Sequence, residues 1–476
     1  MNNTDRKQGM LENTEEPRRH RPSLSRRRFF AGAALAGLAA ATPGGHGGSA
    51  MAATAMSGPP PVPPAPAPAP FMPTLLGPPG MVSPEQYLSV YNFGARGDGK
   101  TDDTAAIQKA LDAAGKQRGN VVLLPRGEYL IRGSLHVPQD VTLQGIFRAP
   151  NRGAVDHNYG SLLLAVGGRG RPDGRPLISL GQNGTLYGLA ILYPEQTAPE
   201  RPVEYPWTVR QLSDNGSLVN VTLLNPWQVV DFGTVTGGRH YIHGLYGQPL
   251  KTGLFIDKCE DVGRVTDVHF WPFWKPRAME FTSRHTTAFL IGRTDWQYMV
   301  NCFAIAHKIG YHFVHTPAGA PNVLLTQCGS DEGAPGTKSI SVLVESGKAG
   351  GVSFLNGQFG GSPSVYVTAG NTGTVKFTNC AFGAGPMTDS VVVLEDGIAS
   401  FTNCRFSGWP RKAPTIVARG GGLMVQGCAF VSTGGRHVAL ERGAGAAVIV
   451  GNLFHGRMRI RNQIGNRAKI GLNAAS

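Results

Sequence analysis

Charge is scarce in this chain, and so are long apolar runs. Only 16% of its 476 residues are charged, and no stretch of 18 or more apolar residues occurs in it. Helical bundles and coiled coils need many charged and aliphatic residues at helical spacing, so the composition argues against both. A protein that crosses a membrane several times needs long apolar stretches, so that class is excluded as well.

Cysteine is also scarce, whereas glycine and proline are abundant. The six cysteines never come close enough in sequence to form a C-x-x-C zinc motif, so we expect no metal site of that kind. The 65 glycines and 35 prolines make about a fifth of the chain. Aliphatic and aromatic residues are still too frequent for a disordered chain, so a β-rich fold with many turns is favoured.

The first 84 residues are predicted to lie outside the folded domain. Residues 25–30 read Ser-Arg-Arg-Arg-Phe-Phe and precede an Ala-rich run, which resembles a twin-arginine export signal over residues 1–57. The proline-rich stretch 58–84 predicts an extended linker. We therefore expect twin-arginine export to the periplasm or the medium, with no membrane span left after the signal is removed.

The positive charge belongs mostly to the part of the chain after the signal. Lys and Arg number 45 against 31 Asp and Glu, and about +10 of the net +14 remains without residues 1–57. This excess favours an anionic partner, such as a uronic-acid polysaccharide or a cell surface. A generic basic surface is the alternative. We expect no nucleic-acid partner.

The domain is predicted to begin with a strand over residues 89–93, a glycine-rich turn and a helix. One apolar helix face is formed by Ile107, Ala110, Leu111 and Ala114. Residues 94–101 match the phosphate-binding pattern G-x-x-x-x-G-K-T. We reject a nucleotide site because two carboxylates, Asp102 and Asp103, follow directly where phosphates would be repelled.

This opening resembles that of the pectate-lyase superfamily. The resemblance rests on residues 93–104, which read FGARGDGKTDDT, and on residues 124–129, which read LPRGEY. That superfamily includes polygalacturonase-like hydrolases, rhamnogalacturonases, mannuronan epimerases and phage tailspikes. The resemblance implies an all-β, right-handed parallel β-helix with an N-terminal capping helix, and an action on polysaccharides.

A repeat in the sequence supports a β-helix independently. Five similar segments end in phenylalanine at intervals of 23 or 24 residues: Phe359, Phe382, Phe406, Phe430 and Phe454. The same phase extends upstream to residue 188 with looser steps. One coil for each step gives about eleven coils in a single domain over residues 85–465, followed by a C-terminal tail over residues 466–476.

Two positions within each step have predictable roles. A slot occupied by Asn, Asp, His or Gln fits a turn whose side chains bond from coil to coil; His243, Asn356 and Asn379 are examples. Five of the six cysteines directly follow this slot, so they should point inward and stack. Export would permit disulfides, but we expect buried, unpaired thiols that act as small apolar fillers.

Chemistry is expected near the enlarged coils, at residues 188–220, 267–301 and 327–356, because long insertions on a repeat scaffold commonly form its binding face. The candidate catalytic residues are Asp257, Asp295, Glu280, Arg293 and His269. The candidate substrate-binding residues are Trp271, Trp274, Trp296, Arg264 and Glu332. The alternatives are that the tryptophans seal the flank of the coils and that His269 is ordinary surface.

Two reactions fit these residues. Hydrolysis needs two carboxyl groups that face each other across the glycosidic bond, and Asp257 with Asp295 is the best pair. β-Elimination instead needs a base and neutralisation of the uronate carboxylate, which Arg293, Arg264 or His269 could supply. We expect no organic cofactor, and Ca²⁺ only if the protein is a lyase.

The chain also departs from the family it resembles. Its central coils lack the Asn-Thr-Asp and Gly-His-Gly motifs of polygalacturonases, and it lacks the Tyr-Gly-Phe-Asp-Pro-His motif of mannuronan epimerases. No catalytic residue is therefore carried over from the resemblance. We expect an exported glycoside hydrolase or polysaccharide lyase that acts on an acidic, pectin-like polysaccharide. The alternative is a non-catalytic β-helix, either a glycan-binding surface protein or a tailspike-like adhesin.

Overall fold

The structure, a computed structural model, describes residues 87–117, 119–149, 160–272, 277–345, 351–383, 390–408, 412–432 and 435–476. The predicted export signal (1–57) and linker (58–84) lie outside these residues. The described residues are almost entirely β structure, with two α-helices, α1 (Thr104–Gly115) and α2 (Ala278–His285). None of the described helices is long and apolar enough to span a membrane.

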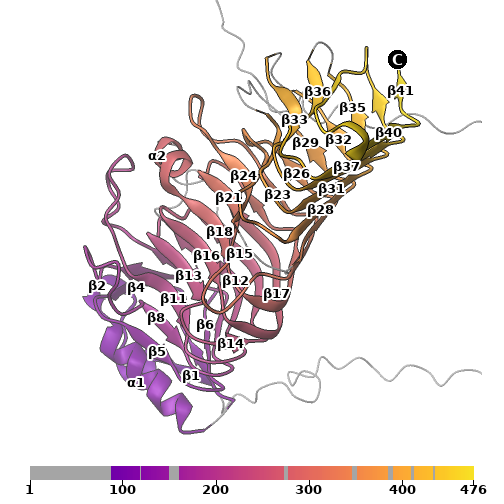
Figure 1. Ribbon diagram of the computed structural model, residues 1–476. Helices are drawn as coiled ribbons and strands as arrows, with labels where there is room; N and C mark the ends of the chain where they lie inside the picture. The colour runs from indigo at the N-terminus through magenta and orange to yellow at the C-terminus, as the bar shows by residue number, and fades with distance from the viewer. Residues whose placement is uncertain are drawn as a thin grey trace, which may run out of the picture. The chain divides into compact units, whose positions relative to one another are not determined.

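Parallel strands pair from coil to coil and form a right-handed parallel β-helix (Figure 1). Sheet B has 13 strands in the described part of the chain. They are β5 (Leu135–Val137), β8 (Ile178–Leu180), β11 (Trp207–Gln211), β13 (Gln228–Phe232), β16 (Thr252–Ile256), β18 (Thr287–Ile291), β21 (Ile309–Val314), β24 (Ile340–Glu345), β27 (Val365–Val367), β30 (Val392–Leu394), β33 (Pro414–Ala418), β36 (Arg436–Leu440) and β39 (Ile460–Asn462).

Sheet A contains two ladders, which we call A1 and A2. Ladder A1 holds β1 (Tyr87–Ser89), β3 (Val121–Leu123), β6 (Thr142–Gln144), β9 (Thr185–Tyr187), β12 (Ser217–Leu224), β15 (Tyr241–Gly247), β17 (Cys259–Phe270), β19 (Thr294–Val300), β22 (Val323–Thr326), β25 (Gly351–Leu355), β28 (Thr374–Thr378), β31 (Ile398–Thr402), β34 (Gly422–Gln426), β37 (Ala446–Val450) and β40 (Ala468–Gly471), with β14 (Gly237–Gly238) beside β17.

Ladder A2 holds the shorter segments of the same sheet. They are β2 (Asp98–Asp102), β4 (Gly127–Ile131), β7 (Ser161–Ala165), β10 (Ala190–Leu192), β20 (Phe303–Ala304), β23 (Gly329–Ser330), β26 (Gln358–Phe359), β29 (Ala381–Phe382), β32 (Arg405–Phe406), β35 (Ala429–Phe430), β38 (Leu453–Phe454) and β41 (Ala474–Ala475). The second halves of β12, β15 and β17 continue into this ladder. Each coil therefore contributes one segment to A1, one to A2 and one to sheet B.

The repeat predicted the fold but missed coils at both ends. The thirteen strands of sheet B exceed the expected eleven coils, because β5 and β8 belong to early coils that lack the closing phenylalanine. The C-terminal residues, expected to be a tail, form β40 and β41, which pair with β37 and β38. The coiling therefore continues to the last residues of the chain.

The glycine-rich opening has a structural role. The carboxylate of Asp103 is buried and accepts hydrogen bonds from the backbone N–H groups of Arg96 (2.7 Å) and Gly97 (3.0 Å). The strand expected over residues 89–93 is mostly a 3₁₀ helix, η3 (Val90–Phe93), which ends at Gly94 with a φ of 97°. The predicted apolar face of α1 is fully buried, and α1 packs against β1, β3 and β5 at the N-terminal end of the coils.

The polar slot marks the sharp turn between A1 and A2. Its residues adopt left-handed backbone conformations, for example Asn356 with φ 56° and Asn379 with φ 53°. Asparagine tolerates this conformation better than most side chains do, which explains the recurrence. The slot expected at His243 falls one residue later, at Gly244. The predicted side-chain bond from coil to coil occurs between Asn301 Nδ2 and Asp267 Oδ1, at 2.6 Å.

The core consists of side chains stacked in columns. All six cysteines are buried and unpaired, as expected. Phe354, Phe377 and Phe401 stack with ring centroids 5.2 Å apart and nearly parallel planes. The closing phenylalanines form a second column, whose neighbouring centroids lie between 4.7 and 5.3 Å apart. These columns bury the apolar face of every coil against the next coil.

Truncation of one ring tests the contribution of these columns. We expect Phe401→Ala to lower the free energy of unfolding by about 3–5 kcal/mol, because it leaves a cavity between stacked rings. Ile398→Ala is the matched control on the same strand, because Ile398 is 48% exposed and its truncation should cost less than about 0.5 kcal/mol. Guanidinium denaturation followed by circular dichroism measures both. Equal losses would contradict the column model.

Candidate functional site

The predicted site residues lie in separate parts of the β-helix. We call the side of sheet B where its strands begin the amino edge, and the side where they end the carboxyl edge. Asp257, Arg293 and Asp295 gather at the carboxyl edge. Glu280, on α2, precedes β18 at the amino edge. Because β16 and β18 pair in register over five residues, these two groups are about 15 Å or more apart.

Asp257, the first choice for catalysis, is locked inside a turn. It is only 5% exposed and follows β16 directly. Its Oδ1 accepts hydrogen bonds from the backbone N–H of Arg293 (2.7 Å) and from Oγ1 of Thr316 (2.9 Å). A carboxylate used in this way satisfies two partly buried donors, so its primary role is to hold the turns of neighbouring coils together.

Arg293 joins this turn to Asp295. Its Nη2 donates to Asp295 Oδ1 at 2.7 Å, and its Nη1 donates to the carbonyl oxygen of Cys259 at 2.9 Å. The second carboxylate oxygen of Asp295 accepts from the backbone N–H of Asp261 at 3.2 Å. The two aspartates expected to face each other across a sugar bond are thus both engaged in contacts within the carboxyl edge.

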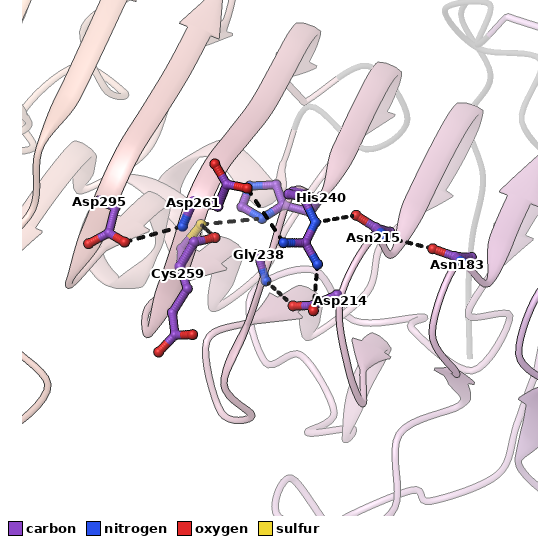
Figure 2. A network of polar contacts seen from close by, with 10 residues as sticks. Asn183, Asp214, Asn215, Gly238, His240, Cys259, Asp261 and Asp295 are labelled. Atoms are coloured by element: carbon purple, nitrogen blue, oxygen red, sulfur yellow. Dashed lines mark hydrogen bonds and ion pairs between the residues drawn. The ribbon is translucent and has the colours of Figure 1, made fainter.

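The carboxyl edge continues as a polar network through earlier coils (Figure 2). Arg239 donates to Asp214 Oδ2 at 2.7 Å, to Asn215 Oδ1 at 3.1 Å and to Asp261 Oδ2 at 3.4 Å. Asn215 in turn donates to Asn183 Oδ1 at 2.6 Å. Several of these residues have left-handed backbone conformations, including Asn183, Asn215 and Asp261. The network therefore caps successive tight turns.

A histidine and a cysteine lie behind this network, in the core. His240 Nδ1 and Cys259 Sγ are 3.9 Å apart. Burial lowers the pKa of His240 to about 4 and raises the pKa of Cys259 to about 12. Both groups are therefore neutral near pH 7, because burial disfavours their charged forms. A reactive thiolate–imidazolium pair does not form here at neutral pH.

Three other predicted residues lie near the amino edge or on ladder A2. Glu280 is exposed and forms an ion pair with Arg284 on the same helix at 3.1 Å. His269 packs against Trp271, with ring centroids 5.4 Å apart, and burial lowers its pKa. Partial burial and the charge of Asp331 raise the pKa of Glu332. Within the described residues, no hydrogen bond or ion pair joins the side chains of Glu280, His269 and Glu332 to one another.

The predicted tryptophans also separate. Trp271 packs on a small apolar cluster of Leu162, Ala190, Leu192 and Leu224, so the sealing alternative describes it well. Trp296 and Arg264 lie exposed on the outer face of ladder A1. Trp274 lies outside the described residues.

A groove runs along the outer face of sheet B, over its C-terminal coils. It has a volume of about 590 Å³. Its floor is a column of outward residues that pair in register from β27 to β39: Tyr366, Val393, Val417, Ala439 and Arg461. The floor is thus mostly apolar, with an aromatic ring at one end and a guanidinium at the other.

The lining of this groove is strongly basic. Six cationic side chains line it: Lys308, Lys338, Lys412, Arg419, Arg436 and Arg461. One carboxylate, Glu441, joins them, and its Oε2 lies 3.8 Å from Arg419 Nε. Arg419 also pairs with Glu395 at 2.6 Å. The remaining excess of positive charge suits an extended anionic ligand.

Sequence reasoning missed this groove, although a signal for it exists. Lys308, Lys338 and Lys412 each come just before a strand of sheet B, and Arg436 begins one. The starts of neighbouring parallel strands lie on one edge of the sheet, so these cations gather at the amino edge. The enlarged coils and carboxylates on which the predicted site rests do not mark these positions. In the described residues, no cluster of three or more His, Cys, Asp or Glu side chains could hold a metal ion.

Comparison with known proteins agrees with the architecture. A family model described as rhamnogalacturonase A/epimerase, pectate lyase-like, matches residues 87–155. The N-terminal fragment of bacteriophage phi29 gene product 12 superposes with a TM-score of 0.53 at 12% identity, covering 82% of this chain and 70% of that one. That likeness concerns the fold alone. The protein is a parallel β-helix, and its N-terminal part is similar to a pectate lyase-like family model.

Two curated relatives from Azotobacter vinelandii match shorter stretches. Alginate lyase 7 is 35% identical over 136 residues, which is 22% of this chain and 16% of that protein. Mannuronan C5-epimerase AlgE3 is 58% identical over 46 residues, 10% of this chain and 2% of that protein. The chain therefore spans a minor part of the length of the curated relatives it matches.

Two variants of Asp257 distinguish a turn lock from a catalytic group. We expect Asp257→Ala to lower the free energy of unfolding by about 1–3 kcal/mol, because the Arg293 N–H and the Thr316 hydroxyl lose their acceptor. Asp257→Asn keeps an acceptor oxygen, so it should stay nearly as stable as the parent. Urea denaturation measures stability, and polysaccharide cleavage by the folded fraction measures activity. A stable Asp257→Asn protein without activity would restore Asp257 as a catalytic residue.

Proposed function

We propose that this protein is an exported polysaccharide lyase that cleaves an acidic polysaccharide by β-elimination. The observation that carries the proposal is the groove on sheet B, with six cationic side chains and one carboxylate around an apolar floor. Uronate polymers present one carboxylate on each sugar, and a row of fixed cations can bind and neutralise several of them at once. The apolar floor suits the less polar faces of the sugar rings.

The residues of the groove favour elimination over hydrolysis. Glycoside hydrolysis needs two carboxyl groups about 5–9.5 Å apart across the bond. Among the described lining residues, only Glu441 carries a carboxylate, and it lies beside Arg419. Elimination needs a base and positive charge near the uronate carboxylate, and the groove offers Tyr366, Lys412 and Arg436 for these roles.

The proposed reaction removes one proton and breaks one bond. A cation of the lining neutralises the uronate carboxylate, which makes the proton on C5 more acidic. Tyr366 is the candidate base of the groove that takes that proton. The C5–H electrons form a C4=C5 double bond, the C4–O bond breaks, and the departing oxygen receives a proton from the protonated base or from water. Each cleavage thus produces two new chain ends, one a reducing end and the other an unsaturated sugar.

The relatives support chemistry on uronates. One of them is named an alginate lyase and another a mannuronan C5-epimerase, and both match this chain over limited stretches. Tyrosine can abstract a proton when its phenolate is stabilised by neighbouring positive charge. From the sequence we expect a pectin-like substrate. The proposal is broader and names a uronate polymer, because cations in the groove can bind a carboxylate on any uronate sugar.

Export is part of the proposal and has its own test. The arginine pair at Arg26 and Arg27 supports a twin-arginine signal. We expect replacement of both by lysine to keep the protein in the cytoplasm, whereas lysine at Arg18 and Arg19 should leave export unchanged. Fractionation of the producing cells, followed by immunoblotting, measures this. Equal export of both double variants would exclude the twin-arginine route.

Cleavage is tested with alginate and polygalacturonate, by the ultraviolet absorbance of the unsaturated product. We expect Tyr366→Phe to lower kcat roughly 100-fold or more, because the base is lost while the ring remains. Lys412→Ala should mainly raise KM, because it removes a carboxylate-binding charge. Lys376→Ala, on the outer face of ladder A1, is the matched control and should change neither. New reducing ends without unsaturation would show hydrolysis, and binding without cleavage would show a non-catalytic protein.

A further inference from the structure

Strand β19 has an unusual outer face. In a strand on a β-helix, alternate residues point into the core and out to solvent. The inward residues Gln297 and Met299 are fully buried. The outward residues Trp296, Tyr298 and Val300 are 48%, 40% and 38% exposed. The three outward positions of this part of the strand therefore all present a large, mainly apolar side chain to solvent.

The neighbouring strands extend this surface around a cation. Tyr241, Arg264, Tyr298 and Leu324 pair in register on β15, β17, β19 and β22. Successive parallel strands are about 4.8 Å apart, so Arg264 lies between two exposed tyrosines that are about 10 Å from each other. We call the surface formed by Tyr241, Arg264, Trp296, Tyr298 and Leu324 the A1 patch.

The A1 patch is local to these coils. Further along ladder A1, the residues in register with Leu324 are Ser353, Lys376 and Ser400. The aromatic residues therefore gather on β15 and β19 instead of following the whole ladder. A contiguous exposed apolar patch with a polar surround commonly marks a binding surface.

We propose that the A1 patch is a second polysaccharide-binding surface, separate from the groove on sheet B, and that it holds a strand of the same acidic polymer. Aromatic faces pack against sugar rings, and the guanidinium of Arg264 can bind a uronate carboxylate between them. This inference rests on the proposed function for the choice of polymer. Because A1 and sheet B are different sides of the coil, one polymer chain could be anchored on the patch while the groove acts elsewhere.

Charge favours a polyanion over a second copy of this chain as the occupant. No carboxylate in the described residues forms an ion pair with the guanidinium of Arg264. In a symmetric contact between two A1 patches, the guanidinium of Arg264 would be buried near aromatic rings and near the Arg264 guanidinium of the second copy. Burial of these charges without a carboxylate acceptor is costly. An acidic polysaccharide supplies the missing carboxylate.

The test measures polymer binding separately from cleavage. Full-length protein carrying Tyr366→Phe is run in native gels containing alginate or polygalacturonate, and gels containing neutral dextran give the baseline. We expect the further changes Arg264→Ala, Trp296→Ala and Tyr298→Ala, made together, to weaken retention by the acidic polymers about tenfold or more. Ile398→Ala, an equally exposed apolar position on the same ladder, is the control and should leave retention unchanged.

Activity separates this inference from the proposed function. With the parent Tyr366 restored, the triple change should leave cleavage of short uronate oligosaccharides unchanged while slowing cleavage of the long polymer. Loss of retention in a protein that never cleaves any polymer would support the patch and sink the lyase proposal. Unchanged retention in the triple variant overturns the patch. Conversion of a dimer to a monomer by the triple change, seen in analytical ultracentrifugation, also overturns it and assigns the surface to a second copy.

Discussion

The in-register pairing of parallel strands from coil to coil is the constraint on which the rest of this structure depends. Each residue lies about 4.8 Å from its equivalent in the next coil, so any preference at one position is repeated as a column. Inside, columns such as Phe354, Phe377 and Phe401 stack ring on ring. On the outside, the same geometry places the outward side chains of successive coils side by side, so that they form continuous surfaces. Core and binding face are thus two consequences of one backbone arrangement.

This arrangement suits a polymeric ligand. The groove floor from Tyr366 to Arg461 crosses five strands of sheet B in register, and the A1 patch crosses four strands of ladder A1. Cations such as Lys412 and Arg436 lie beside the floor at the amino edge of neighbouring strands. A ligand that repeats along its own length can therefore meet a surface that repeats along the protein. The two surfaces face different sides of the same coil.

The carboxyl edge of sheet B shows a structural reason for acidic residues near an enlarged coil. Its turns need left-handed residues and acceptors for exposed backbone N–H groups, and Asp and Asn serve both needs. Asp257 and Asp295 are engaged in such contacts with Arg293. The sequence shows an acidic residue near an enlarged coil but does not show the hydrogen-bond donors around it. Carboxylates that accept bonds within turns therefore cannot be distinguished in the sequence from carboxylates that face a substrate.

The parallel β-helix, the turn slot and the buried cysteines were predictable from the sequence, because they follow from local preferences that recur in every coil. The helix at the N-terminal end was predictable from its apolar periodicity. The sequence did not determine the full extent of the coils, since β5, β40 and β41 lack the phenylalanine signature. Only the tertiary structure decided which outward residues share a surface. Lys308 and Arg461 line one groove although more than 150 residues separate them. The loops between strands differ in length from coil to coil, so the spacing in the sequence does not show which residues become neighbours. That alignment is set only when the strands pair in the folded chain.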